Sequence, residues 1–294
     1  MTKTAVIVDS SAAIPQSIRN SYDIIEVAIP IIFGEETYMG GQDLQTVDQL
    51  MKIIDEKKMQ GNTSQPSPAQ WEQALNQAKD SGYEDAVIIT LSSGISGAYQ
   101  TAKLIAESYE GLNRIEVVDS KLINMAVFDQ AVLVRKLSEA GKSMDDILAV
   151  LQDYRDNLGV RLVVNDISHL KRTGRLSRGQ ALVGGLLNIK PILTFDIPGD
   201  GKISAIGKAR KMSGAKDMIQ QSFEEYLAQV DFPVRSYILD AGAKKVGDKW
   251  LKDFQAKYPA VTFERGVLDP VVTVHTGNES MAIIWARDYT SYLD

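Results

Sequence analysis

One junction restricts the possible folds of this chain more than any other sequence feature. It is the point where the pattern of a buried strand ends in a hydroxyl- and glycine-rich turn that precedes a helix. The apolar residues 86–90 lead into the turn at residues 91–97, and a helix-compatible stretch follows at residues 99–106. At such a junction, backbone N–H groups and side-chain hydroxyls point to one place outside the sheet edge. The sequence therefore predicts an α/β fold with a binding site for a small anion at this edge.

Strand-like and helix-like stretches alternate along the first half of the chain. This alternation is typical of a parallel sheet flanked by helices. The expected strands cover residues 5–8, 24–32, 86–91 and 115–118, and the expected helices cover residues 47–58, 68–80, 99–107 and 122–140.

The pattern changes near residue 160. We therefore expect an N-terminal α/β domain over residues 1–160, which carries the hydroxyl-rich loops, and a C-terminal α/β domain with a mixed sheet over residues 161–294. A helix at 144–157 precedes the change. After it we expect strands at 160–164, 191–195, 202–206, 235–239, 261–263, 271–275 and 281–285, a hairpin turn at 198–201, and helices at 181–187, 214–228 and 246–257.

The start of the helix at residue 68 is specified locally. Ser67 can cap it, Pro68 suits the first helical position, and Gln70 can complete a capping box. The preceding loop, residues 63–66, is therefore expected to sit in a fixed place.

Composition excludes several classes of protein. With 44% apolar residues in 294, the chain can bury a large core, and a net charge of −6 argues against a broad nucleic-acid footprint. The absence of cysteine excludes disulfides, thiolate metal sites and a cysteine nucleophile, and two histidines are too few for a multi-histidine metal centre. The N-terminus has no signal-peptide pattern and no apolar run is of membrane-spanning length, so we expect a cytoplasmic protein.

Three segments are candidates for one anion site. Their side chains can hold a carboxylate or phosphate through hydroxyls and an imidazole. The alternative is that they are turn, cap and core residues without a ligand, and for His169 a structural or surface role is expected. The candidates are Thr63 and Ser64, then Ser92, Ser93 and Ser96, and finally His275 after an alternating Val-Val-Thr-Val run.

A basic cluster is the second candidate region. It comprises residues 171–175, where Arg175 is the last, with Arg178 and a further group at residues 208–211 that contains Arg210. Such a cluster is either a solvated face or a docking surface for an acidic or phosphate-bearing partner.

A serine hydrolase is an alternative, because Ser93, His275 and a carboxylate such as Asp9 could converge. The spacing Gly94-Ile95-Ser96-Gly97 nevertheless lacks the G-x-S-x-G nucleophile pattern.

Seven motifs, in this order, span nearly the whole chain. They are Val8-Asp9-Ser10-Ser11, Thr63-Ser64-Gln65-Pro66-Ser67, Ser92-Ser93-Gly94-Ile95-Ser96-Gly97, Val118-Asp119-Ser120-Lys121, Leu170-Lys171-Arg172-Thr173-Gly174-Arg175, Leu187-Asn188-Ile189-Lys190-Pro191-Ile192-Leu193 and His275-Thr276-Gly277. Together they resemble the DegV family.

The resemblance implies a two-domain protein that holds one long-chain fatty acid between its domains. Such a protein is the acyl-carrying subunit of a bacterial fatty acid kinase, and a separate ATP-dependent subunit converts the bound acid to acyl phosphate for phospholipid synthesis. By the same resemblance, Thr63 and Ser93 bind the carboxylate, Ser64, Ser92, Ser96 and His275 lie nearby, and Arg175 and Arg210 face the kinase subunit.

The family pattern also implies no cofactor, no catalysis by this chain alone and transient membrane contact for lipid exchange. The sequence contains no P-loop to hold ATP. A lipid sensor without a kinase partner is a further alternative. The chain departs from the family where Gly277-Asn278-Glu279 replaces Gly-Pro-Gly, where Thr173 precedes Gly174 and at Gly40-Gly41. Apolar stretches at residues 27–32, 126–128 and 182–187 are expected to line the acyl tunnel.

Overall fold

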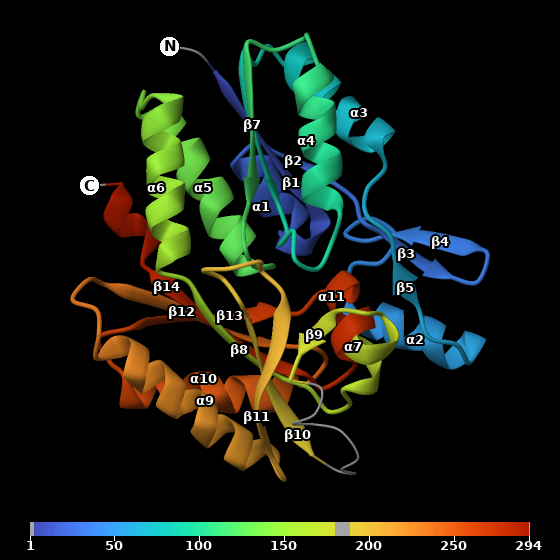
Figure 1. Cartoon of the computed structure of the whole chain (residues 1–294), viewed down its shortest axis with the longest axis vertical. Coiled ribbons are helices and arrows are strands. Elements are labelled where there is room, and N and C mark those ends of the chain that lie inside the picture. The colour runs from blue at the N-terminus through green and yellow to red at the C-terminus, as the bar shows by residue number, and fades with distance from the viewer. Residues whose placement is uncertain (1–2, 180–188, 294) are drawn as a thin grey trace.

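The computed structural model describes residues 3–179 and 189–293. A four-stranded parallel sheet forms the upper half of the molecule in Figure 1, in the order β2-β1-β6-β7. Its central strands are buried at every position, because helices cover both faces of the sheet. The strands are β1 (Thr4–Asp9), β2 (Ile24–Val27), β6 (Asp85–Thr90) and β7 (Arg114–Asp119), and the helices are α1 (Gln16–Ser21), α3 (Pro68–Asp80), α4 (Ala98–Ser108), α5 (Met125–Glu139) and α6 (Met144–Asp156).

A seven-stranded mixed sheet forms the lower half, in the order β13-β12-β14-β8-β10-β11-β9. Two helices, α9 (Met212–Leu227) and α10 (Lys244–Lys257), pack against it through an aromatic cluster that includes Phe223, Phe254 and Trp285. The strands are β8 (Gly159–Val163), β9 (Leu176–Arg178), β10 (Lys190–Phe195), β11 (Ile203–Ala209), β12 (Val234–Asp240), β13 (Thr262–Val267) and β14 (Met281–Arg287).

A small antiparallel sheet lies beside the junction of the two halves. It contains β4 (Glu36–Met39), β3 (Pro30–Phe33) and β5 (Asn62–Thr63), and α2 (Val47–Lys57) lies between β4 and β5 in the chain. The sequence predicts one strand over residues 24–32, and this prediction is wrong. The chain leaves the parallel sheet after β2, where Ser10 accepts the Ile29 N–H and Pro30 has no N–H to donate.

Residues 271–275 form a helix, α11 (Pro270–Thr276), and the predicted strand there is wrong. The alternation of β-branched residues favours a strand, but the residues before it specify a helix start. The Asp269 side chain accepts the Val272 N–H, and Pro270 occupies the first turn. Short elements that the sequence did not predict are α1, β4, β5 and β9, together with η1 (Ser10–Ala12), α7 (Ser168–Arg172) and η2 (Tyr289–Tyr292).

Other local predictions are confirmed. Ser67 and Gln70 form the expected capping box, and Ser143 caps α6 with Asp146 as its partner. Strands β10 and β11 pair as the predicted hairpin. The helix predicted at residues 181–187 lies outside the described residues.

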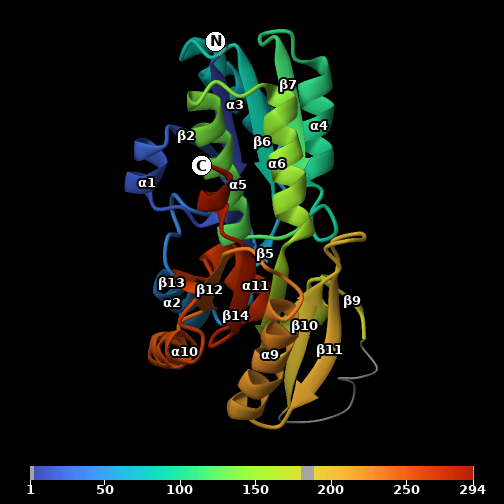
Figure 2. The same ribbon diagram turned by 90° about the vertical axis from the view of Figure 1, so that its left-hand side faces the viewer.

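The two halves pack against each other. The strands of the parallel sheet all precede residue 159 and those of the mixed sheet begin there, while one apolar core cluster draws on both. Figure 2 shows the C-terminal η2 returning to the upper half beside α5. The domain boundary near residue 160 stays a prediction that this division supports. Within the described residues, no helix is both long and apolar enough to cross a membrane.

Candidate functional site

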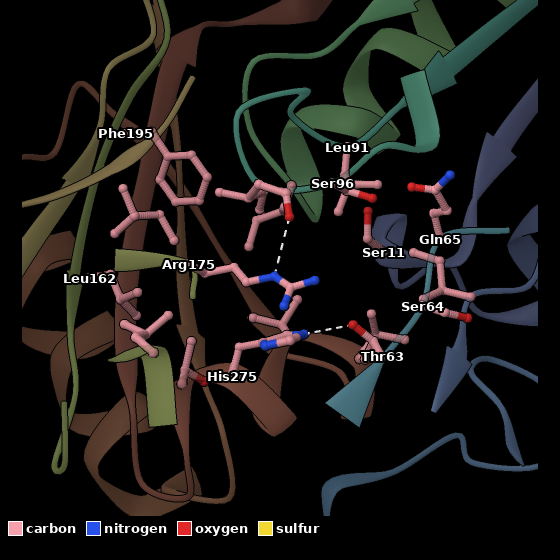
Figure 3. A pocket seen from close by; sticks show the side chains of 18 residues that line it. Ser11, Thr63, Ser64, Gln65, Leu91, Ser96, Leu162, Arg175, Phe195 and His275 are labelled. Atoms are coloured by element: carbon pink, nitrogen blue, oxygen red, sulfur yellow. Dashed lines mark hydrogen bonds between the residues drawn. The ribbon is translucent and has the colours of Figure 1, made fainter. Parts of the chain in front are cut away.

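A cavity of about 50 Å³ lies between the two halves (Figure 3). In that view Arg175 and His275 are central, hydroxyl side chains lie on one side, and Leu162 and Phe195 lie on the other. The cavity is therefore polar at one end and apolar at the opposite end. Its polar lining consists of Ser11, Thr63, Ser64, Gln65, Ser96, Arg175, His275 and Thr276, and its apolar lining of Ile29, Leu91, Ile95, Ile123, Leu162, Leu170, Phe195, Ile203, Val271 and Val272.

Thr63 and His275 meet at the centre of this cavity although they are 212 residues apart. Thr63 lies in β5, which is fixed by pairing with Ile31 of β3. His275 lies in the last turn of α11, and its Nε2 is 2.8 Å from the Thr63 hydroxyl oxygen. The structure thus brings together two of the residues that the sequence assigned to one site.

His275 carries no charge at neutral pH. Burial, together with the nearby cations Arg175 and Arg172, lowers the pKa of His275 to about 3. Its second nitrogen, Nδ1, is buried and has no hydrogen-bond partner among the described residues. A neutral imidazole leaves Arg175 as the positive charge at the centre of the cavity.

Arg175 lies just before β9 and enters the cavity. Its Nε donates to the Ile95 carbonyl over 3.4 Å, and its Nη1 donates to the Thr173 carbonyl. No carboxylate of the described residues pairs with it, and burial lowers the pKa of this guanidinium. Unused donors on an unpaired, half-buried cation favour an anion.

The hydroxyl groups of the cavity differ in whether their protons are available to a ligand. Ser96 accepts the Ala98 N–H over 3.2 Å and donates to none of the described residues, so its own proton is available to a ligand. Ser11 donates its proton to Asp9, which also accepts the Leu91 N–H, and burial raises the pKa of Asp9 to about 6. Ser11 can therefore accept but not donate in this arrangement.

Ser92 and Ser93 do not line the cavity, although the family resemblance assigns Ser93 to the carboxylate. The Ser92 hydroxyl donates to the Gly201 carbonyl over 2.8 Å, and the Ser93 hydroxyl donates to Asp119 over 2.5 Å. A side chain at Gly94 would collide with the Asp200 carbonyl, so glycine lets this turn pack closely against the β10–β11 turn. The turn thus forms a wall, with Ser96 on the cavity side and Ser93 on the other.

The remaining predicted residues fall in different places. Ser64 lines the cavity, whereas Arg210 is exposed just after β11 and makes no hydrogen bond or ion pair with the described residues. Sequence reasoning missed Ser11 and Gln65, although both lie in motifs that it singled out. It also placed Arg175 at a docking surface, because a sequence does not show which arginine of a basic cluster turns inward.

The predicted apolar lining is partly different as well. Residues 27–32 contribute Ile29, whereas residues 126–128 contribute nothing to the described lining. Residues 182–187 are not among the residues that the structure describes. Most of the apolar end comes instead from the mixed-sheet half. In the described part of the chain, no three acidic or histidine side chains are grouped to hold a metal ion.

Comparison with known proteins gives consistent matches over nearly the full length. A family model described as "Uncharacterised protein, DegV family" matches residues 3–288. A DegV domain-containing protein of Listeria monocytogenes is 31% identical over 288 residues, which cover 97% of this chain and 98% of that one.

Solved structures are similar too. DegV of Bacillus subtilis, described as a fatty acid binding protein, has 28% identity and a TM-score of 0.87, with 98% of this chain and 100% of that one covered. A fatty acid binding DegV family protein of Streptococcus agalactiae has 29% identity and a TM-score of 0.88 at the same coverage. The matched folds have the same α/β architecture, with one parallel and one mixed sheet. The chain therefore belongs to the DegV family.

Proposed function

We propose that this protein binds a long-chain fatty acid, with its carboxylate in the polar end of the cavity and its chain toward the apolar end. The observation that carries the proposal is the unpaired Arg175 beside Thr63 and a neutral His275. The fatty acid binding described for the Bacillus subtilis and Streptococcus agalactiae proteins supports it.

The head group has a defined set of donors. The Arg175 guanidinium supplies the charge, and the free Ser96 proton supplies a hydrogen bond. When His275 carries its proton on Nε2, it donates to Thr63, and the Thr63 proton is then available to the carboxylate. Ser64 lies at the edge of the same group of hydroxyls.

The chain of the acid needs more room than the head group. A cavity of about 50 Å³ holds a carboxylate or a few waters. A long chain therefore requires the apolar walls at Leu162, Leu170, Phe195 and Ile203 to move apart. Each buried methylene contributes about 0.8 kcal/mol, so the chain supplies most of the affinity.

We further propose that the bound carboxylate is presented to a separate ATP-dependent kinase subunit. A carboxylate oxygen attacks the γ-phosphorus of ATP, the new O–P bond forms, and the bond to the β-phosphate oxygen breaks to release ADP. The carboxylate is already ionised, so the step depends on positioning rather than on a base. Exposed Arg210 is the residue we assign to contact with that subunit.

The geometry does not favour a serine hydrolase. The Ser93 hydroxyl is bonded to Asp119, and His275 is bonded to Thr63. A catalytic serine needs a histidine within hydrogen-bond distance to remove its proton. In this arrangement the histidine and the serine have separate partners.

Native mass spectrometry of protein purified from bacteria tests binding. We expect an added mass equal to one fatty acid, which organic extraction releases and identifies. An empty protein that also fails to bind added oleate would reject the proposal.

Hydroxylamine trapping tests presentation separately. The loaded protein, a fatty acid kinase subunit and ATP together should yield acyl hydroxamate, and omission of any one should abolish it. Arg210→Ala should retain lipid but slow the reaction. Lipid binding without hydroxamate would instead favour a lipid sensor.

A further inference from the structure

A second cavity lies on the other side of the wall formed by the Ser92–Gly97 turn. It has a volume of about 540 Å³ and lies at the carboxyl ends of β6 and β7, against α6 and the β10–β11 turn. Ser93 lines this cleft, whereas Ser96 lines the head-group cavity. The carboxyl ends of parallel strands are a common location for ligands, and the volume is typical of a small-molecule site.

Arg155 provides an unpaired cation in the cleft. Its Nη2 donates to Gln152 over 2.7 Å, and its Nη1 lies 3.5 Å from the Gln130 amide oxygen. Both partners are neutral, and no carboxylate of the described residues lies within ion-pair distance. Burial lowers the pKa of this guanidinium, and Asp119 and Asp156 offset only part of that effect. The N–H donors of the planar Arg155 guanidinium that have no partner are suited to bind a phosphate.

The other charged groups near Ser93 already satisfy one another. Asp119 accepts the Ser93 hydroxyl and the Lys121 N–H, and Lys121 Nζ lies 3.3 Å from Asp119. Lys121 also donates to the Gly199 carbonyl over 3.1 Å. This network is locally neutral, so it does not repel an anion held at Arg155.

The rest of the lining suits a hydroxylated carbon skeleton. Asp156 accepts from Gln152 through one oxygen, which leaves its second oxygen for hydroxyl donors. Tyr99 and Pro198 add apolar surface, and the Tyr99 hydroxyl has no hydrogen bond to the described residues. An organic anion without hydroxyl groups would offer no donor to that second Asp156 oxygen.

We propose that this cleft binds a phosphorylated polyol of the size of a sugar phosphate. Arg155 holds the phosphate, Asp156 accepts from hydroxyls, and the Tyr99 ring covers one face of the carbon skeleton. The assignment does not rest on fatty acid binding, because the two cavities share a wall but none of their described lining residues.

Calorimetric titration with ribose 5-phosphate, inorganic phosphate and ribose tests the proposal. We expect saturable binding of ribose 5-phosphate, about tenfold weaker binding of phosphate, and none of ribose. No saturable heat from ribose 5-phosphate at millimolar concentration overturns the proposal. Equal affinity for inorganic phosphate overturns the assignment to a polyol.

Matched variants locate the site. Arg155→Gln should weaken ribose 5-phosphate binding by about tenfold or more. Arg114→Gln should not change it, because Arg114 is an exposed arginine at the opposite end of β7, paired with Glu116 and Asp145. Equal binding by the two variants overturns the assignment.

A second variant keeps the test decisive if Arg155→Gln fails to fold, as judged by circular dichroism. Asp156→Asn changes an exposed side chain and should weaken ribose 5-phosphate binding without weakening phosphate binding. Unchanged affinity for both probes overturns the role of Asp156 and with it the polyol assignment.

Discussion

Two hydroxyl groups on opposite sides of the Ser92–Gly97 turn, those of Thr63 and Ser93, have hydrogen-bond partners of different charge. On the cavity side, Thr63 pairs with His275, which is neutral. On the cleft side, Ser93 pairs with Asp119, a carboxylate that also has Lys121 close by. The hydroxyls are chemically equivalent, so the difference lies in what each one is bonded to.

This difference decides where a carboxylate head group can bind. The Ser93 proton is already donated to Asp119, so Ser93 has no proton to donate to a carboxylate head group. Among the described residues that line the cavity there is no carboxylate beside Thr63, and Arg175 adds a positive charge. A hydroxyl beside this turn can therefore donate to a ligand carboxylate only where its own partner is neutral.

The largest effect is expected for Arg175→Gln. Removal of the unpaired cation should weaken fatty acid binding about 10- to 100-fold, because a hydrogen bond to a charged group is worth about 1.5–3 kcal/mol. Fluorescent fatty acid displacement measures this. The control is Arg178→Gln, since Arg178 is 68% exposed and lies near Asp196 and Asp200. Equal loss in both variants would contradict a specific role for Arg175.

Thr63→Val should have the next largest effect. The variant keeps the shape of the side chain but removes the donor and leaves His275 Nε2 unpaired. Affinity should fall about tenfold, which corresponds to about 1.4 kcal/mol. Thr262→Val on the exposed position of β13 is the control and should bind as the wild type does. Wild-type affinity in Thr63→Val would remove Thr63 from the head-group site.

Much of this arrangement could be predicted from the sequence because local signals specify it. The capping box at Ser67 fixes the loop that carries Thr63, and the small residues of the turn predict backbone groups near a ligand. Helix α11 shows that hydrophobic periodicity alone can predict the wrong element. The alternating β-branched residues predict a strand, whereas Asp269 and Pro270 start a helix. In the folded protein the capping residues outweigh the strand-like periodicity.

The direction of each side chain was not predictable. Ser93 and Ser96 are three residues apart in one turn, and only the packing of the turn sends them to different cavities. Arg175 likewise belongs to a basic cluster whose other members are exposed. Such choices depend on contacts between segments far apart in the chain, which no local pattern records.

Buried carboxyl groups lie near the cavity side of the turn, among them Asp269, and their titration should make the stability of the protein depend on pH. Burial, together with the nearby carboxyl groups of Glu26 and Asp9, raises the pKa of Asp269 to about 7. A carboxyl group with a raised pKa in the folded state gives stability that is full below about pH 4 and lost as pH rises through about 7. The unfolding free energy should therefore fall between pH 5.5 and pH 8.

Asp269→Asn isolates this contribution. Asparagine can still accept the Val272 N–H, so the cap of α11 is kept while the titrating group is removed. The loss of unfolding free energy between the two pH values should shrink by on the order of 1 kcal/mol relative to the wild type. Urea unfolding at each pH measures it. An identical pH dependence in both proteins would show that Asp269 is already ionised at the lower pH.

The smallest effect is expected for Ser93→Ala, and it tests the comparison most directly. Its hydroxyl is bonded to Asp119 and faces the cleft, so its removal should change fatty acid affinity by less than about twofold. The loss of that bond should lower the unfolding free energy by about 1 kcal/mol. Ser96→Ala is the matched variant on the other side of the same turn and should weaken binding more. If Ser93→Ala weakens binding as much as Ser96→Ala does, the carboxylate contacts both sides of the turn, and the neutral partner of Thr63 does not determine its position.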